Sequence, residues 1–126
     1  MNNAAVARAL FDALAAVDDA AVRAVCAPDF ALRQNGGAAI DVAMLLHFNR
    51  LVHGIVRDFR YEDVVCAATP TGFVEEHAVR GMLADGTALD LAACIVADVK
   101  DGRVTSAREY VDTAAAAPLL KALARR

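Results

Sequence analysis

Side chains able to transfer protons fall in two segments whose apolar and polar residues alternate. Residues 73–82 alternate as a β-strand does, and the period of two places Glu75 and His77 on one face. Residues 104–112 alternate in the same way and carry Glu109. A histidine is a usable general base near neutral pH, and a carboxylate beside it can fix its tautomer or act as an acid. We therefore predict a catalytic set of His77, Glu109 and Glu75.

This prediction is testable by mutation, and it has a simpler alternative. If His77 and Glu109 line one pocket, replacing either by Ala or Gln lowers activity about 10² to 10⁴-fold and leaves the fold intact. In the alternative, Glu75 and Glu76 are solvated at the rim of a sheet, and the backbone or Tyr61 satisfies His77. Polar side chains used in this way fit a binding domain without turnover.

Five further residues are predicted to bind substrate. Arg33 and Asn35 lie close to a glycine pair that forms a turn, and they are placed at the pocket mouth. Met44 and Phe48 are four residues apart in a helical segment, and Val79 shares a strand face with His77. These three residues are therefore placed in the pocket lining.

The composition argues against several partners and cofactors. A formal charge of −3 without long runs of Lys or Arg offers no surface for phosphate groups, so we expect no nucleic acid. The apolar runs are far shorter than the roughly 20 residues of a membrane-spanning helix, and the start lacks the basic segment of a signal peptide. We expect no membrane partner and a cytoplasmic location. Phosphate-loop, dinucleotide and metal-ligand patterns are also missing, which predicts no cofactor and no metal.

The chain length of 126 residues fits a single domain, 1–126, with the order helix, helix, short strand, helix and then a long antiparallel meander. Helical spacing predicts two helices before Pro28, the second of which carries Cys26. A third helix is predicted between Asp41 as its cap and Gly54 as its stop.

The period changes from helical to alternating from Val56 onward, which predicts the strands of the meander. The predicted strands cover residues 59–68, 73–84, 87–100 and 104–112. Two Asp-Gly pairs, Asp85-Gly86 and Asp101-Gly102, are typical of two-residue hairpins because both central residues need positive φ. A last helical turn or two is expected within residues 114–124, with a start that Pro118 leaves open.

This order of elements predicts an α+β fold in which the helices pack on one face of an antiparallel meander. The strands are rich in Val, Ile and Leu on both faces, so the other face also needs cover. A second copy of the chain would provide it, which predicts a homodimer through the outer sheet face.

Several motifs resemble those of the nuclear transport factor 2-like superfamily, to which SnoaL-like proteins and ketosteroid isomerases belong. The resemblance covers almost the whole chain. It rests on Ala27-Pro28-Asp29-Phe30, the helix 41–53, Asp101-Gly102-Arg103-Val104 and Arg108-Glu109-Tyr110-Val111-Asp112. It implies a cone-shaped half-barrel, in which a curved, mostly antiparallel sheet carries about three helices on its concave face around a small-molecule pocket.

The enzyme branches of this superfamily match the chain to different extents. Ketosteroid isomerases place a tyrosine and two carboxyl groups where this chain has apolar, amide or thiol side chains. Limonene epoxide hydrolases use an Asp-Arg-Asp triad and an asparagine. Gln34-Asn35 resembles the asparagine position, and Glu109 falls on one of the two aspartates. The Arg and the other Asp would fall near His77 and Val79, so the rest of the triad is not present. The resemblance implies an acid/base enzyme (isomerase, cyclase, dehydratase or hydrolase) acting on a small apolar molecule. The alternative is a non-catalytic ligand-binding or accessory dimeric domain.

Overall fold

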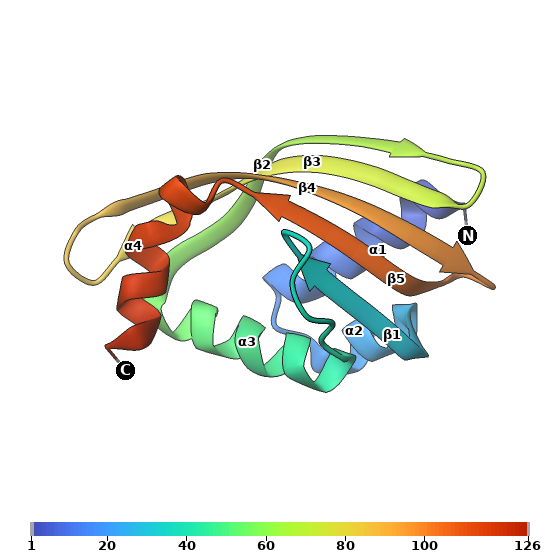
Figure 1. Ribbon diagram of the computed structural model, residues 1–126, viewed down its shortest axis with the longest axis horizontal. Coiled ribbons are helices and arrows are strands. Elements are labelled where there is room, and N and C mark those ends of the chain that lie inside the picture. The colour runs from blue at the N-terminus through green and yellow to red at the C-terminus, as the bar shows by residue number, and fades with distance from the viewer. Residues whose placement is uncertain (1, 126) are drawn as a thin grey trace.

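The computed structural model describes residues 2–125, which form four helices on one face of a five-stranded sheet (Figure 1). The predicted α+β class is thereby confirmed. In chain order the elements are α1 (Asn3–Ala15), α2 (Asp19–Val25), β1 (Cys26–Gln34), α3 (Val42–Ile55), β2 (Val56–Ala68), β3 (Gly72–Leu83), β4 (Ala88–Lys100), β5 (Arg103–Val111) and α4 (Thr113–Ala124).

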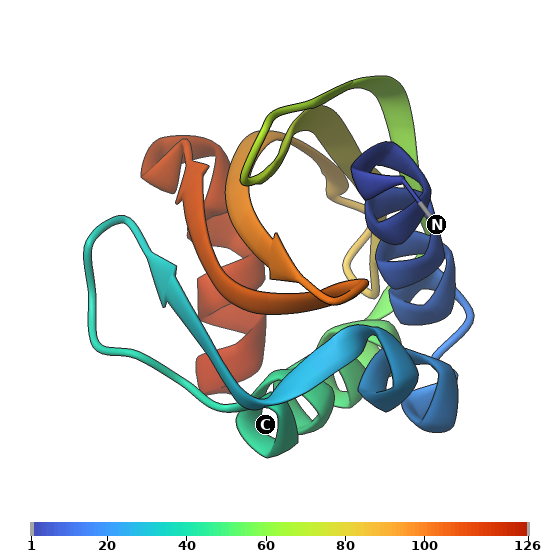
Figure 2. The same cartoon turned by 90° about the vertical axis from the view of Figure 1, so that its right-hand side faces the viewer.

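The sheet has the strand order β1-β5-β4-β3-β2, with β1 parallel to β5 and the other neighbours antiparallel. The sheet curls without closing, and α1, α3 and α4 are arranged around its open side, as Figure 2 shows. The predicted cone-shaped half-barrel is therefore confirmed, with four helices in the described residues instead of about three.

Each helix begins behind a side chain that accepts a hydrogen bond from a free backbone N–H of the first turn. These caps are Asn2, Asp18, Asp41 and Asp112. Helix α4 has 12 residues, more than the turn or two expected, and contains Pro118. The Ala, Leu and Lys residues around Pro118 favour helix strongly enough that α4 continues past the hydrogen bond that Pro118 cannot donate.

Strand β1 begins where a helix was predicted. Cys26 is its first residue, and Pro28 lies within the strand instead of ending a helix. The pairing of β1 with β5 shifts register between Cys26 and Ala31. Pro28 therefore lies where no regular ladder needs its missing N–H, which is the setting in which strands tolerate proline.

Two bulges bend β2 around the helices. Its register with β3 shifts around Asp58 and again around Asp63, each time by one extra residue on β2. Both aspartates have a φ of 55°, in the left-handed region that Asp tolerates better than most residues. Because a bulge bends its strand and increases the local twist, these two positions contribute to the cone shape of the sheet.

One of the two predicted two-residue hairpins is confirmed. At Asp101-Gly102 the two φ angles are 54° and 76°, as both central residues of such a turn require. At Asp85-Gly86, by contrast, the positive φ, 87°, belongs to Gly86, and Leu83 pairs with Thr87. This loop has three residues, because a right-handed turn followed by one left-handed glycine closes a hairpin of that length.

The buried core has two parts. Val6, Phe73 and Val104 are fully buried where α1 and α2 cover the sheet, and Leu89 and Leu119 lie in a second cluster under α4. Within residues 2–125, no helix has the length and apolar character needed to cross a membrane.

Candidate active site

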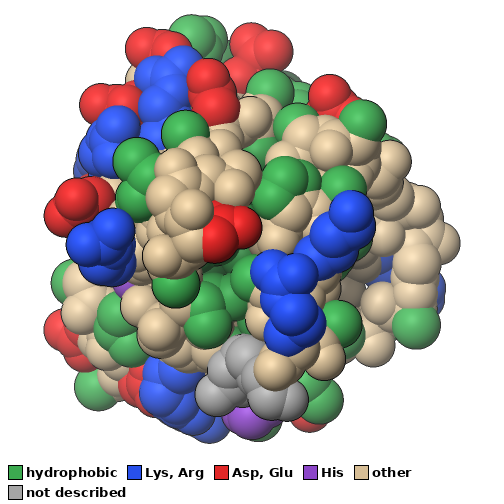
Figure 3. All heavy atoms as spheres, turned by 90° about the vertical axis from the view of Figure 1, so that its left-hand side faces the viewer, with side chains coloured by type: hydrophobic (Ala, Val, Ile, Leu, Met, Phe, Trp, Pro, Cys, Tyr) green, Lys and Arg blue, Asp and Glu red, His purple; other side chains and the backbone are tan. Residues whose placement is uncertain are grey.

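A cavity of about 490 Å³ lies between the concave face of the sheet and helices α1, α3 and α4. Hydrophobic side chains gather between charged ones at the end of the molecule that carries α4 and the β3–β4 hairpin (Figure 3). A cavity of this volume is typical of small-molecule sites. Most of its lining is aliphatic or aromatic, and the polar side chains are Gln34, Asn49, Tyr61, Glu109 and Thr113.

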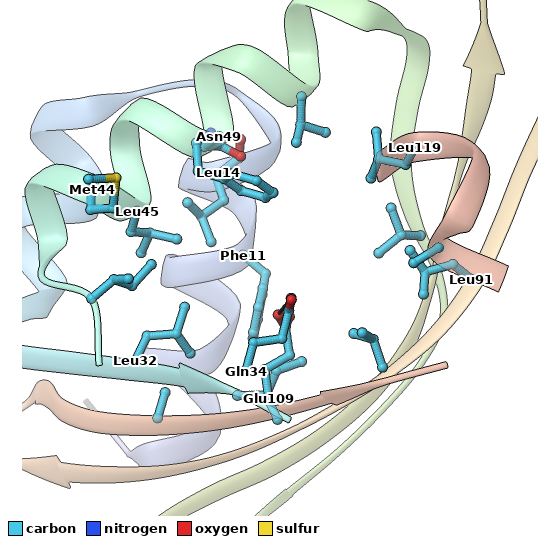
Figure 4. Close-up of a pocket in the computed structure, with 18 of the residues that line it drawn as sticks. Phe11, Leu14, Leu32, Gln34, Met44, Leu45, Asn49, Leu91, Glu109 and Leu119 are labelled. Carbon is cyan, nitrogen blue, oxygen red and sulfur yellow. Dashed lines mark hydrogen bonds between the residues drawn. The ribbon is translucent and has the colours of Figure 1, made fainter. Parts of the chain in front are cut away.

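The Glu109 carboxylate projects into this cavity from β5, beside Gln34 of β1 (Figure 4). The two residues are register partners in the parallel pair of strands, so their side chains share a face. Gln34 Nε2 donates a hydrogen bond to Glu109 Oε1 over 2.7 Å. The structure thus places the predicted residue Glu109 in the cavity and holds its carboxylate with an amide, while its catalytic role stays a prediction.

His77 and Glu75 lie behind the cavity wall. His77 Nδ1 is 2.7 Å from Glu75 Oε2, and both side chains are 1% exposed. The expectation of solvated residues at a sheet rim is therefore wrong for Glu75. Neither residue lines the cavity, because the rings of Phe11 and Tyr61 cover His77 with centroid distances of 5.0 and 4.5 Å.

The three predicted catalytic residues nevertheless share one face of the sheet. Glu75 on β3 pairs with Ile95 on β4, which in turn pairs with Glu109 on β5. His77 follows Glu75 by two residues and therefore points to the same side. The structure brings His77 to Glu75 and leaves Glu109 two strands away, hydrogen-bonded to Gln34.

Tyr61 separates the buried pair from the cavity. It lines the cavity, and its ring also contacts the rings of Phe11, Phe59 and His77. Burial raises the pKa of the Tyr61 hydroxyl well above its usual range, and the negative charges of Glu109 and Glu75 raise it further. The phenol therefore remains protonated and can donate a hydrogen bond.

Three of the five predicted substrate-binding residues line the cavity. They are Met44 and Phe48 of α3 and Val79 of β3. Arg33 and Asn35 are not among the residues that line it, and their placement at the pocket mouth stays a prediction. Alternation along β1 turns the residue between them, Gln34, toward the cavity, and the two flanking side chains point elsewhere.

The two flanking side chains stabilise the turn after β1. Arg33 Nη1 donates to the Gly37 carbonyl oxygen over 2.9 Å. Asn35 Nδ2 donates to the Val111 carbonyl oxygen over 3.3 Å, and Asn35 Oδ1 accepts from the Val111 N–H over 3.0 Å. Both residues have a structural role that the glycine-rich turn explains.

Asn49 was missed from the sequence although its spacing contains a signal. It lies four residues after Leu45 and three before Val52, so it shares the buried face of α3. Asn49 Nδ2 donates to the Leu14 carbonyl oxygen over 3.0 Å, which fixes the amide opposite Gln34 and Glu109 (Figure 4). A polar residue on an otherwise apolar helical face is the feature that could have identified it.

The described part of the chain contains no group of three or more His, Cys, Asp or Glu side chains arranged to hold a metal ion.

Comparison with known families agrees with this architecture. The SnoaL-like domain family matches residues 7–107, and the chain belongs to that family. Its fold is that of the nuclear transport factor 2-like superfamily, as the resemblance implied. Among curated proteins no match was found.

Solved structures with the same fold include candidate polyketide cyclases and an epoxide hydrolase. A candidate polyketide cyclase from Xanthomonas campestris is 24% identical over 87% of this chain and 90% of its own, with a TM-score of 0.77. An epoxide hydrolase from M. tuberculosis, of the limonene-epoxide-hydrolase-like type, is 22% identical over 98% and 90%, with a TM-score of 0.74. IdmH, a candidate polyketide cyclase from Streptomyces antibioticus, is 16% identical over 96% and 99%, with a TM-score of 0.83.

Proposed function

We propose that the protein is a SnoaL-like enzyme that transfers protons on a small, largely apolar molecule, with Glu109 as the acid/base group. The observation that carries this proposal is one carboxylate, Glu109, held by Gln34 at the wall of an otherwise apolar cavity. The role proposed for Glu109 depends on its position, because a general base must lie within hydrogen-bond reach of the proton that it removes.

The reaction class is isomerisation, cyclisation, dehydration or hydrolysis, each of which needs a proton moved at carbon or oxygen. The candidate cyclases and the epoxide hydrolase among the structurally similar proteins support this range of reactions. The cavity lining contains no Lys or Arg side chain in the described residues, which favours a substrate without strong negative charge.

The direct test is exchange of acidic C–H protons for deuterium. Apolar aryl ketones such as 2-acetonaphthone are incubated with the protein in D₂O, and exchange beside the carbonyl group is followed by NMR. Glu109→Gln keeps the shape of the side chain but removes the base, so exchange should fall about 10² to 10⁴-fold. Glu76→Gln, an exposed residue of the opposite face, is the matched control. Equal exchange rates in wild type and Glu109→Gln would refute the assignment of Glu109.

A non-catalytic ligand-binding domain is the second candidate. It is favoured by the pairing of the polar groups with one another, since Gln34 holds Glu109 and Glu75 holds His77. Tight binding of the ketones without any deuterium exchange would support this alternative.

We also propose a homodimer through the convex face of the sheet. A row of register partners across this face runs from Val65 through Glu76 and Cys94 to Tyr110. Val65 is 62% exposed and Tyr110 is 49% exposed, and a second copy would cover these two large side chains. Light scattering should give twice the 13.3 kDa chain mass, and Tyr110→Glu should shift it toward the monomer. A stable dimer needs at least about 1,000 Å² of total buried area.

A cytoplasmic location belongs to the same proposal. Cys26, Cys66 and Cys94 are free thiols, and Cys66 is exposed. Such thiols persist in a reducing compartment.

A further inference from the structure

The geometry points to Tyr61 as a second catalytic residue, whose hydroxyl donates a hydrogen bond to the substrate oxygen while Glu109 moves the proton. His77 and Glu75 are then positioning residues that act through Tyr61. This inference rests on the acid/base function proposed above. It also gives a role to the buried pair of Glu75 and His77, which the proposal for Glu109 leaves without one.

The first argument is the placement of Tyr61. It belongs to β2, and its register partner on β3 is Val79, which also lines the cavity. The hydroxyl is buried and lies near the carboxylates of Glu109 and Glu75. No group of residues 2–125 forms a hydrogen bond with it. Tyr61 thus lines the cavity with a hydroxyl donor that no group of residues 2–125 uses.

The second argument is that neighbouring rings hold the phenol in one orientation. Phe11 and Phe59 contact the Tyr61 ring edge-on, at centroid distances of 5.5 and 5.1 Å and interplanar angles of 76° and 85°. His77 lies against it at 4.5 Å with a tilt of 43°. A donor fixed in this way loses little entropy when it binds an oxygen, and such preorganisation is the main source of electrostatic catalysis.

The third argument concerns the burial of Glu75 and His77. An ionisable pair with 1% exposure is costly to bury and contributes less to stability than apolar side chains of the same size. Neither residue reaches the cavity, so neither can touch a ligand there. The Glu75 hydrogen bond to His77 Nδ1 fixes the imidazole, and the imidazole in turn supports the Tyr61 ring.

The chemistry of the step balances with these groups alone. Glu109 removes a proton from the carbon beside a carbonyl group, the electron pair of the C–H bond forms a C=C bond, and the π pair of the C=O bond moves to the oxygen to give an enolate. The Tyr61 hydroxyl donates a hydrogen bond to that oxygen and keeps its own proton. Glu109 then returns the proton to a carbon, or to a leaving oxygen in a dehydration. Loss of one such donor lowers the rate about 10² to 10³-fold.

The experiment uses the full chain with 2-acetonaphthone as the probe, and its carbonyl stretch is measured by infrared spectroscopy. In wild type the band should shift to lower wavenumber than in an apolar solvent. Tyr61→Phe should lose that shift, whereas Glu109→Gln should keep it. The rate of deuterium exchange should fall about 10² to 10³-fold in Tyr61→Phe, while the dissociation constant of the ketone changes little.

The positioning role is tested with the double variant Glu75→Leu/His77→Phe. This variant replaces both partners by apolar groups of similar shape and avoids a lone buried charge. We expect it to fold, to bind the ketone and to show a weaker, broader carbonyl shift. Wild-type band position and exchange rate in this variant would overturn the role of the pair.

The outcomes separate this inference from the proposed function. A shifted carbonyl band without exchange in wild type would leave Tyr61 as a ligand-binding donor and refute the enzyme. Exchange that survives in Tyr61→Phe, together with an unshifted band in wild type, would refute Tyr61 and leave Glu109 in place. Failure of wild type to bind the ketone at millimolar concentration would count against Tyr61 as a donor to neutral carbonyl groups.

Discussion

Glu75 and His77 are two residues apart on β3, and their side chains meet at 2.7 Å beneath α1. The contact follows from the strand period, because residues i and i+2 project from the same face. Each group is buried only because the other is present, since an isolated buried charge or donor is costly.

Breaking this pair should destabilise the protein. His77→Ala leaves the Glu75 carboxylate buried without its partner, so the free energy of unfolding should fall by about 3 to 5 kcal/mol. Urea denaturation followed by circular dichroism measures it. The double variant Glu75→Leu/His77→Phe should recover most of the loss, and equal losses in the two variants would contradict this account. The initial expectation that a His77 substitution leaves the fold intact is replaced by this prediction.

Filling the cavity should block binding without unfolding the chain. Val79 lines the cavity beside Tyr61, and Val79→Phe adds a ring in the space where a ligand would lie. The affinity for 2-acetonaphthone should fall at least about tenfold, equivalent to roughly 1.4 kcal/mol. Isothermal calorimetry measures the affinity, with Val64→Phe on the exposed part of β2 as control. Unchanged affinity in Val79→Phe would place the ligand elsewhere.

Stability should fall at alkaline pH because of Cys26. Burial raises the pKa of this thiol to about 11 from an ordinary value of 9.0. Between these values the unfolded chain loses a proton that the folded chain keeps, so the free energy of unfolding falls as pH rises, by up to about 1.4 kcal/mol per unit. Urea titrations of wild type and Cys26→Ala from pH 8 upward should therefore converge. Parallel pH profiles would show that Cys26 does not contribute.

Two glycine-to-alanine substitutions should have opposite effects. A Cβ at Gly72 would lie 1.8 Å from the Ala97 carbonyl oxygen, so the backbone of β3 or β4 must move. Gly72→Ala should cost about 3 kcal/mol or more. A Cβ at Gly54 in α3 meets nothing within 4 Å, and Gly54→Ala should stabilise the protein by about 0.5 to 1 kcal/mol. Thermal unfolding compares the two variants, and a stable Gly72→Ala would contradict the close approach of these strands.

Much of the fold could be predicted because its signals are local. Alternation placed Glu75, His77 and Val79 on one face, and the Asp-Gly pair at residues 101–102 determined a hairpin. The strand that contains Pro28 was not predictable in this way. Proline is tolerated in this strand only because the pairing with β5 shifts register there, and β5 is more than seventy residues away in the chain.

The site was only partly predictable for the same physical reason. The period of a strand tells which side chains share a face, but it does not tell which of them a helix will cover. Phe11 of α1 covers His77, whereas Glu109 two strands away stays open to the cavity. The sequence did not show that Gln34 faces the cavity and that Arg33 and Asn35 do not. Which of these side chains faces inward depends on the pairing of β1 with β5, and the register shift changes that pairing.

The loop after β1 is fastened at both of its ends. At one end Asn35 bonds Val111 through both atoms of its amide, and at the other Leu32 and Ile40 form an isolated bridge. Residues 36–39 therefore extend from a closed base, and Ala38 borders the cavity. Since doubling the length of such a loop costs only about 0.6 kcal/mol, this is the position where a longer segment could be grafted to cover the cavity mouth and change which molecules enter.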